Sequence, residues 1–430
     1  MVKEIKIQNY KSVQDLTLEL GRVNVLIGAN GCGKSNILEA IAFGSAAAED
    51  KLGNEFLSAR GIRVTDSKAM RSGFSKSSKD KQIIIDFLTT ELNSSLNFTL
   101  IHDNKPFSEW QQSKEKSAYI KFDDLIKETI KLNIPLDSKE KALKIYIDAL
   151  VEREKKIKDF KFKFPDSEIG NYLEQDLISK KEIQITSIES EFVEMFLPVF
   201  SDLVIKKIFQ EFHNFIIYAP ENTFLRKFEE ESQIEPLGIK GEGLFKLLSV
   251  MKQETVEEFQ EIIENLELID WFDGFEIPKD LVFTERRIKI KDRFLEEGLQ
   301  YFDQRSSNEG FLFLMFYFAL FISKYTPKFF AIDNIDASLN PKLCIELIKI
   351  LTKLAKKHDK QVIFTTHNPA ILDGLNLNDD EVRLLVVSRN KDGHTKTKRI
   401  TPTSVPEGEI SVRLSEKFMR GYIGGLPKNF

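Results

Sequence analysis

Residues 28–36 read Gly-Ala-Asn-Gly-Cys-Gly-Lys-Ser-Asn and have the types and spacing that can hold a polyphosphate. They follow the apolar run 23–27 and precede the helical run 37–43. A strand that ends in a glycine-rich turn and continues as a helix presents free backbone N–H groups to an anion. Lys34 is then placed to neutralise the β- and γ-phosphates of ATP, and the Ser35 hydroxyl to ligate Mg²⁺. The residues predicted to bind the nucleotide in this loop are Asn30, Gly31, Cys32, Gly33, Lys34, Ser35 and Asn36.

Two later stretches supply side chains for the same chemistry. The apolar run 329–332 ends in Asp333, and an aspartate at the carboxyl end of a buried parallel strand can hold Mg²⁺ through water. The run 361–365 repeats the design and is followed by His367. Because this strand is the next one along the chain after the strand before Asp333, we expect His367 to act at the same site as Asp333. The sequence therefore predicts Ser35 and Asp333 as the metal ligands.

The elements that must position these residues are those of an α/β fold. Alternating apolar residues in the first 20 positions predict two half-buried strands that lead into the buried strand 23–27. Residues 82–88 and 96–101 are predicted to form a strand pair. A helical pattern rich in lysine and glutamate then occupies residues 105–212.

Strand patterns return after this helical stretch, at residues 215–219 and 282–290. We therefore divide the chain into four parts. They are an N-terminal lobe with the phosphate loop (1–104), a helical insertion (105–212), a C-terminal lobe (213–401) and a tail (402–430).

The composition places bounds on the function. With 430 residues, of which 42% are hydrophobic and 30% charged, the chain is typical of a globular protein of more than one unit. Acidic residues number 67 against 62 basic ones, which argues against a uniformly basic nucleic-acid coat. Cys32 and Cys344 are too few for a disulfide framework or a structural zinc site. Since neither a signal peptide nor an apolar run long enough to span a bilayer is found, we expect a cytoplasmic protein with no membrane contact.

The opening Ile-Lys-Ile-Gln-Asn-Tyr-Lys-Ser-Val at 5–13, with the phosphate loop and Asn36 behind it, resembles the ABC-type ATPases related to RecF, Rad50 and SMC proteins. The similarity is greatest to the prokaryotic branch that contains the overcoming-lysogenization-defect (OLD) ATPases. This resemblance implies a P-loop ABC-type ATPase head with a short, coiled-coil-like helical insertion. It covers roughly residues 1–50 and 300–400, and the middle of the chain matches by architecture alone.

The resemblance also implies roles for particular residues. His367 corresponds to a switch that contacts the γ-phosphate. Residues 306–310, Ser-Ser-Asn-Glu-Gly, look like a degenerate ABC signature, from which Ser307 and Gly310 are carried over as contacts to the ATP of a partner subunit. An ordinary N-cap before a buried helix would give the same residues at 306–310. A loop and a signature that act on opposite subunits imply a homodimer, or a higher homo-oligomer, closed around ATP. Gln82 and Arg60 are candidates for the family's Q-loop and for an arginine near the nucleotide, and each fits an ordinary surface position equally well.

The chain departs from the family at one catalytic position. The family usually has glutamate after the aspartate of this strand, whereas here Asn334 follows Asp333. An asparagine can orient a water but cannot take its proton, so we expect slow hydrolysis or a base supplied by Asp336 or a displaced acid. Asp336 fits a second role equally well, as the cap of the helix that starts near Pro341.

Three functions remain open. In the first, the chain resembles stand-alone ATPase subunits of bacterial antiphage systems such as Septu or PARIS, which work with a separate nuclease or toxin. The short stretch after residue 400 is too small for the nuclease domain of OLD-type enzymes, and the tail fits either a partner or the chain's own domain. In the second, it is a DNA-repair ATPase of the RecF or SMC kind. Basic residues between 141 and 163 are candidates for DNA contact, although a run of this kind is more often a solvated face. In the third, it is a nucleotide-sensing scaffold with little hydrolysis.

Overall fold

The computed structural model describes residues 1–74, 81–90, 95–106, 108–113, 117–119, 212, 214–228, 236–278, 287–296, 299, 301–402 and 412–426. They belong to one unit, which is made of residues 1–119 and 211–430. The second unit, residues 120–210, carries most of the predicted helical insertion and lies outside the described residues. The basic residues between 141 and 163 therefore also lie outside the description.

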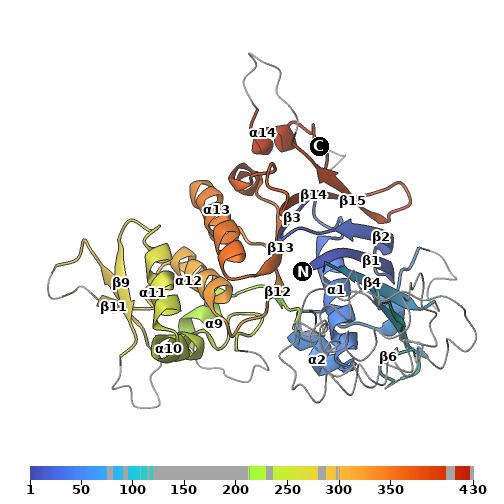
Figure 1. The fold of residues 1–430 in the computed structure, drawn as a ribbon, viewed down its shortest axis with the longest axis horizontal. Coiled ribbons are helices and arrows are strands. Elements are labelled where there is room, and N and C mark those ends of the chain that lie inside the picture. Colours follow the sequence, from blue (N-terminus) through green and yellow to red (C-terminus); the bar gives the residue numbers. More distant parts are fainter. Residues whose placement is uncertain are drawn as a thin grey trace, which may run out of the picture. The chain divides into compact units, whose positions relative to one another are not determined.

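A six-stranded sheet carries the phosphate loop (Figure 1). Its strand order is β15, β14, β3, β13, β12, β8, and all neighbours pair in parallel except β15, which is antiparallel to β14. The three central strands are buried along their whole length, as strands covered on both faces are. The strands are β3 (Val23–Ile27), β8 (Ile217–Tyr218), β12 (Phe329–Ile332), β13 (Gln361–Thr366), β14 (Val382–Arg389) and β15 (Thr395–Ile400).

A second, antiparallel sheet is built from the N-terminal part of the chain. Ile5 and Ile7 of β1 (Val2–Tyr10) pair in register with Leu18 and Leu16 of β2 (Val13–Glu19), and all four side chains are buried. The predicted alternation is therefore confirmed. The sheet continues with β4 (Ile83–Thr89), β5 (Ser95–Ile101), β6 (Gln111–Gln112) and β7 (Ser117–Tyr119).

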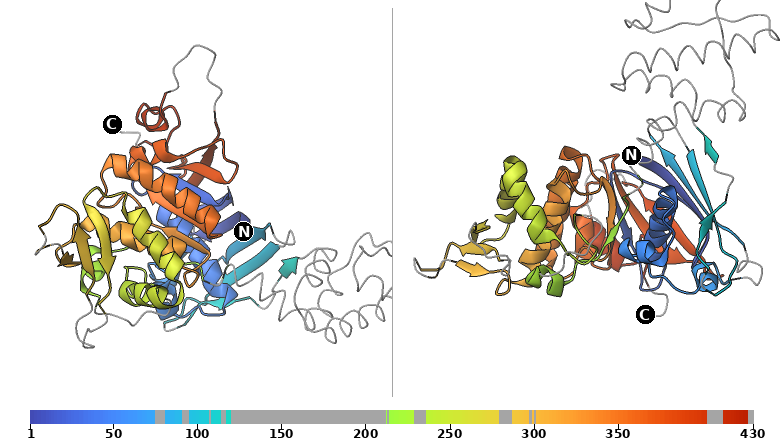
Figure 2. Two further views of the ribbon diagram at one scale, coloured as in Figure 1. Left: turned by 60° about the vertical axis from the view of Figure 1, so that its left-hand side comes forward. Right: turned by 90° about the horizontal axis from the view of Figure 1, so that it is seen from below.

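Helix α1 (Lys34–Ala48) contacts strands of both sheets (Figure 2). At Gly44 a Cβ would lie 2.6 Å from the Phe87 ring of β4, so the helix approaches the antiparallel sheet where it has no side chain. Two short helices follow it, α2 (Asn54–Ala59) and α3 (Ser67–Met70). The start of α1 is thus fixed between two sheets, which is what a binding loop at that end requires.

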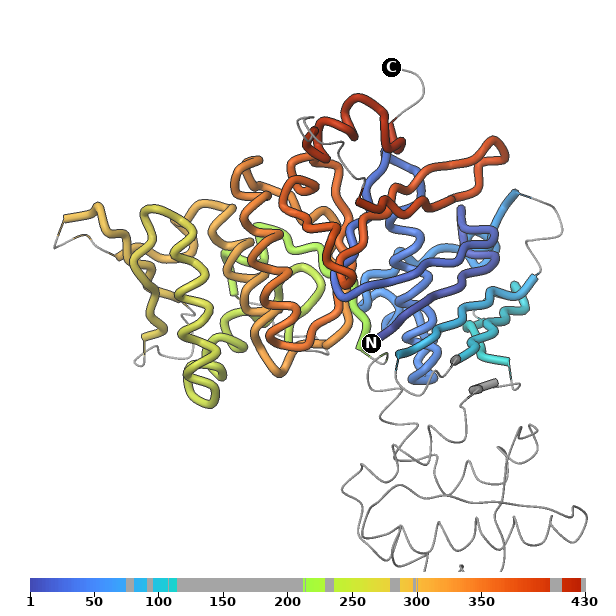
Figure 3. Tube along the Cα trace, turned by 45° about the horizontal axis from the view of Figure 1, so that its top comes forward, coloured from blue at the N-terminus to red at the C-terminus, as the bar shows by residue number. Residues whose placement is uncertain are grey.

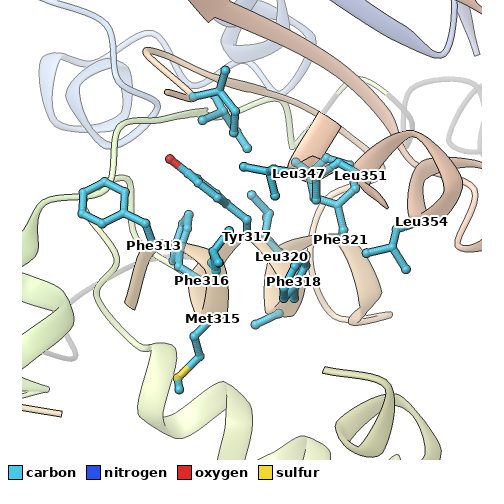
Figure 4. Close-up of a cluster of buried hydrophobic side chains, with 14 of the residues drawn as sticks. Phe313, Met315, Phe316, Tyr317, Phe318, Leu320, Phe321, Leu347, Leu351 and Leu354 are labelled. Carbon is cyan, nitrogen blue, oxygen red and sulfur yellow. The ribbon is translucent and has the colours of Figure 1, made fainter. Parts of the chain in front are cut away.

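An apolar helix forms the core of the C-terminal lobe. In α12 (Glu309–Ile322) every residue from position 311 to 322 is buried, as expected for a helix that is hydrophobic on all sides. Phe316 and Phe321 gather with Leu347 and Leu351 of α13 in one cluster (Figure 4). Figure 3 follows the chain through the elements around this core. They are α9 (Asn222–Lys227), α10 (Leu244–Glu254), α11 (Val256–Leu266), α13 (Pro341–Lys357) and the sheet of β9 (Phe272–Glu276), β10 (Lys289–Asp292) and β11 (Tyr301–Asp303).

Two predicted strands differ in extent from the observed ones. The run 215–219 contributes only the two residues of β8, because the backbone N–H groups of Ala219 and Glu221 bond instead to the carbonyls of Ile239 and Lys240, at 2.8 and 2.9 Å. Of the predicted strand 282–290, the structure describes only the end, where β10 begins at Lys289.

The C-terminal tail packs on its own unit, one of the two possibilities left open by the sequence. Helix α14 (Leu414–Met419) lies against the 3₁₀ helix η3 (Pro369–Gly374), and the backbone N and Oγ of Ser415 both donate to the Asp373 carboxylate, at 2.9 and 2.7 Å. Further along, the tail reaches the start of the phosphate loop, where a Cβ on Gly425 would be 3.7 Å from the Cα of Gly28.

Lys360 closes the C-terminal end of α12. Its Nζ donates to the carbonyl oxygens of Ser323, Thr326 and Pro327 and to the Thr326 hydroxyl, at 2.8 to 3.3 Å. Burial lowers the pKa of Lys360 to about 7, while the surrounding oxygens favour the ammonium form. Since Ser323 is the C-cap of α12 and Lys360 precedes β13, this side chain ties the helix to the central sheet.

Gln361 ties the two sheets together at the opposite end of β13 from the phosphate loop. Its Oε1 accepts a bond from the backbone N–H of Val2 at 2.9 Å, and its Nε2 donates to the carbonyls of Val2 and Gly21, at 2.7 and 2.8 Å. All three bonds are buried.

We expect Gln361→Ala to lower the free energy of unfolding by about 2–4 kcal/mol, because it removes three buried hydrogen bonds to the backbone of Val2 and Gly21, although the Gly21 carbonyl keeps another donor, Asn24. Urea denaturation followed by circular dichroism measures the change. The matched control is Gln253→Ala on the exposed side of α10, for which we expect a change within about 0.5 kcal/mol. Equal stability of the two variants would show that Gln361 does not join the sheets.

Candidate nucleotide-binding site

The phosphate loop joins β3 to α1 and has no space for side chains at its tightest point. Gly31 and Gly33 have φ values of 71° and 110°, a region that favours glycine. A Cβ on Gly33 would lie 2.1 Å from the Thr395 Oγ1. Asn30 and Gly31 are exposed at the rim of the loop, whereas Cys32 and Gly33 are buried.

Lys34 points back into the loop. Its Nζ donates to the carbonyls of Gly28 and Ala29, at 2.9 and 3.3 Å, and lies 3.9 Å from the Cys32 Sγ. Burial lowers the pKa of Lys34, and the nearby Asp333 carboxylate opposes that shift. A buried cation surrounded by backbone carbonyls is prepared to exchange these weak partners for phosphate oxygens.

Ser35 and Asp333 meet although they are far apart in sequence. The Ser35 Oγ donates to the Asp333 Oδ2 at 3.2 Å, and the Thr365 hydroxyl of β13 donates to the other carboxylate oxygen. Mg²⁺ takes oxygen ligands, usually one or two from the protein and the rest from phosphate and water. The hydroxyl and carboxylate therefore fit the ion, with Asp333 oriented from behind by Thr365. The described residues contain no cluster of three or more His, Cys, Asp or Glu side chains that could hold a metal ion without ligands from phosphate and water.

Asn36 is oriented by the N-terminal sheet rather than free in the site. Its Nδ2 donates to the Ser12 Oγ at 2.7 Å, and that oxygen lies 2.7 Å from the Thr395 Oγ1. Thr395 also donates to the carbonyl of Cys32 at 3.0 Å. Ser12, in the turn between β1 and β2, and Thr395, at the start of β15, therefore support the phosphate loop from behind. The sequence did not reveal this role for either residue.

A hollow opens beside Ser35 and Asp333. Charged side chains dominate its polar lining, with cations able to attract phosphate and carboxylates able to bind metal or accept protons. The side chain of Arg63 lines it and donates to Glu39, and its second bond, 3.4 Å long, reaches the Oδ1 of Asn36. The charged lining residues are Glu39, Arg63, Glu221, Lys240 and Asp333.

The two residues considered for the Q-loop and the nearby arginine lie elsewhere. Arg60 is 8% exposed and bonds to Glu49, to the Ser45 hydroxyl and to the carbonyl of Phe215, so it holds the fold together. Gln82 is exposed just before β4. Arg63, three positions after Arg60, is the arginine that lines the hollow, and no local pattern separates the two in the sequence.

His367 follows β13, is exposed, and interacts with the backbone of Gly28 at the start of the phosphate loop. Its pKa is lowered by partial desolvation and by the Lys34 ammonium, an effect that Asp336 and Asp333 oppose. A ring that is uncharged at neutral pH can donate one hydrogen bond and accept another. His367 is therefore close enough to Lys34 and Asp333 for their charges to affect it, as expected for a residue of the same site.

The two candidate catalytic residues after Asp333 do not line the hollow. Asn334 is exposed, has a φ of 56°, and bonds through its backbone N–H to the Thr365 Oγ1 at 2.9 Å. Asp336 accepts a bond from the Thr366 hydroxyl at 2.5 Å. The cap of α13 is Asn340, whose side chain accepts from Leu343, so Asp336 is not the helix cap that the sequence allowed.

Ser307 and Gly310 lie at the start of α12 and are absent from the lining of the hollow. Asn308 caps the helix by accepting a bond from the Phe311 N–H at 2.8 Å. Ser307 is 3% exposed, and its Oγ has no hydrogen-bond partner among the described residues. A Cβ on Gly310 would be 3.2 Å from the carbonyl oxygen of Ser338, so this helix start packs on the loop that follows Asp333.

Comparison with known proteins agrees with this geometry. The model of the AAA ATPase domain family matches residues 1–372. The chain belongs to this family. The AAA ATPase domain thus covers the phosphate loop, Asp333 and His367, and ATP is the nucleotide that the family name implies.

Relatives of this AAA ATPase domain match over shorter stretches. The chain is 33% identical to the uncharacterized protein MJECL10 of Methanocaldococcus jannaschii over 114 residues, which are 25% of this chain and 50% of that one. It is 47% identical to the DNA double-strand break repair Rad50 ATPase of Sulfolobus acidocaldarius over 45 residues, 10% of this chain and 5% of the relative. The matches therefore span half of the first relative and a small part of the second.

Among solved structures, an SMC head bound to the C-winged helix domain of ScpA has a similar fold. The TM-score is 0.50 at 14% identity, over 93% of this chain and 98% of the other. The predicted α/β fold class of an ABC-type ATPase head is confirmed. In the described part of the AAA ATPase domain, no helix is long and apolar enough to cross a bilayer.

We expect Lys34→Ala to weaken ATP binding by at least about 30-fold, because truncating one partner of a buried charge pair costs about 2–5 kcal/mol. Isothermal titration calorimetry with Mg-ATP measures the loss. Lys349→Ala, on the exposed side of α13, is the matched control and should bind as the wild type does. Retained affinity in Lys34→Ala would exclude residues 28–36 as the phosphate site.

Proposed function

We propose that the chain is an ATPase subunit that binds Mg-ATP at the carboxyl edge of the central sheet, hydrolyses it slowly and closes as a dimer to control a separate effector. The observation that carries the ATPase part is the contact between Ser35 and Asp333. A hydroxyl at the start of α1 and a carboxylate at the end of β12 lie 3.2 Å apart beside the phosphate loop. Two oxygen ligands in this position suit a metal-bound triphosphate.

Each residue of the site has a role in this proposal. The backbone of residues 30–33 and the Lys34 ammonium bind the β- and γ-phosphates, and Asn36 borders them. Ser35 and Asp333 hold Mg²⁺, which neutralises phosphate charge when bound. His367 contacts the γ-phosphate. Desolvation and the Lys34 ammonium lower the pKa of His367, and a ring N–H of this side chain can donate to a phosphate oxygen.

Dimer closure explains the start of α12. Ser307 has a buried hydroxyl without a partner in the described residues, at the N-terminus of a 14-residue helix, where anions bind well. This group is absent from the lining of the hollow of its own chain. We infer that Ser307 and Gly310 cover the γ-phosphate bound by a second copy, so that two ATP molecules join two subunits.

The effector part of the proposal rests on the resemblance to stand-alone antiphage ATPases of the Septu and PARIS kind. In this proposal the subunit works in the cytoplasm, and ATP-dependent closure holds or releases a nuclease or toxin in antiphage defence. Two alternatives make different predictions. A RecF- or SMC-like repair ATPase would retain nucleic acid, in keeping with the short Rad50 match. A sensing scaffold, favoured by Asn334, would bind ATP and a partner without turnover.

The test is the native mass of the tagged full-length chain, purified with ATP from its own host with neighbouring genes intact. We expect a dimer or higher oligomer of the chain that carries a stoichiometric nuclease or toxin. Ser307→Ala should weaken the ATP-dependent dimer and leave ATP binding by each subunit intact, because it removes the hydroxyl proposed to cover the partner's γ-phosphate without adding bulk at a buried position. Native mass spectrometry measures both.

Three results would contradict parts of the proposal. A dimer that retains only DNA favours repair, and a complex without hydrolysis favours the scaffold. An ATP-dependent dimer that is as stable in Ser307→Ala as in the wild type removes this residue from the interface. The wild-type chain without nucleotide and the Lys34→Ala chain serve as monomer references.

A further inference from the structure

The site described above lacks an identified proton acceptor for hydrolysis. Asn334 occupies the position where an acid is expected, and an amide cannot accept the proton of an attacking water. It is also exposed and outside the hollow that adjoins Ser35 and Asp333. Asp336 already accepts a bond from the Thr366 hydroxyl at 2.5 Å and does not line the hollow. The carboxylates that line the hollow are therefore the next candidates.

The hollow contains three carboxylates, of which two are committed to other contacts. Glu39 is 2% exposed and accepts bonds from Lys11, Arg63 and, at 3.1 Å, from the Tyr10 hydroxyl. Asp333 accepts from Ser35 and Thr365 and is a predicted metal ligand. The oxygen atoms of both carboxylates are thus already engaged by protein donors, which leaves neither free to bind a water molecule.

Glu221 is the third carboxylate and differs from the other two. Its side chain is 49% exposed, and in the described residues its carboxylate contacts only the Lys240 Nζ, at 3.1 Å. It therefore has oxygen atoms available to a water molecule in the hollow. The Lys240 ammonium that it contacts also lines the hollow.

The backbone of Glu221 is fixed relative to the metal ligands. β8 pairs with β12, and the Asp333 N–H donates to the carbonyl of Tyr218 at 2.8 Å, three residues before Glu221. The Glu221 N–H donates to the Lys240 carbonyl at 2.9 Å, and its own carbonyl accepts from Leu225 at 3.2 Å as α9 begins. The carboxylate thus extends from a rigid segment at the edge where the sheet binds its ligand.

We propose that Glu221 is the general base of ATP hydrolysis in this chain. A water in the hollow attacks the γ-phosphorus, and its oxygen forms the new P–O bond. The bond between that phosphorus and the bridging oxygen breaks, and ADP leaves with the electron pair. The proton of the water goes to the Glu221 carboxylate. This inference rests on the proposed function, since it requires ATP to occupy the hollow beside Ser35 and Asp333.

The test replaces the carboxylate by its neutral isostere in the full-length chain. We expect Glu221→Gln to lower the single-turnover rate of Mg-ATP hydrolysis by at least about 100-fold, the usual contribution of a general base. ATP affinity should remain within about threefold of wild type, because the amide keeps the shape of the side chain. Glu267→Gln, an exposed glutamate after α11, is the matched control, and its rate should equal that of the wild type.

Each remaining outcome decides a separate question. If the wild type hydrolyses ATP and Glu221→Gln does so at the same rate, the inference is wrong and the proposed function stands. A larger loss in Asp336→Asn than in Glu221→Gln would also overturn it. If the wild type binds ATP without hydrolysing it, the inference is wrong because there is no base to assign. If it does not bind ATP, the proposed function fails first.

Discussion

The parallel pairing of β3, β13 and β12 is the constraint on which the site depends. The register places Thr366 opposite Ile27 and Phe364 opposite Ile332, so the phosphate loop, Thr365 and Asp333 emerge at the same edge of the sheet. The Thr365 hydroxyl then bonds to Asp333 and receives the N–H of Asn334. A slip of one residue would turn every side chain of β13 to the other face and remove both contacts.

The rest of the unit stabilises that register from both ends. At the far end of β13, Gln361 bonds to Val2 and Gly21, so the antiparallel sheet cannot slide along the central one. Near the loop, Ser12 and Thr395 connect both sheets to Asn36 and Cys32. The loop therefore keeps its shape because neighbouring strands fill the space behind it, and its glycines keep the front open to a ligand.

The sequence was most informative where a functional residue directly follows or precedes the strand or helix that positions it. The loop at 28–36, the strand before Asp333 and the strand before His367 were all predicted because a local pattern carries them, and the α/β class followed from their order. Arg63 and Glu221 were missed, since each reaches the hollow through a tertiary fold that no spacing encodes. Arg60 and Arg63 are three positions apart in the sequence. Only the packing shows that Arg60 is structural and that Arg63 lines the hollow. The strand at 215–219 was predicted from its apolar run, but its extent was not, because only the two residues of β8 pair in the sheet.

Helix α12 has electrically different ends. Its aligned peptide dipoles give a partial negative charge near Ser323 and a partial positive one near Ser307, and the apolar side chains around it screen neither. The Lys360 ammonium offsets the negative end. No described residue bonds to the buried Ser307 hydroxyl at the positive end. The Asn308 cap and the Glu309 carboxylate in the first turn offset part of the positive end as well, so an arriving anion would meet a helix terminus whose field is already partly compensated.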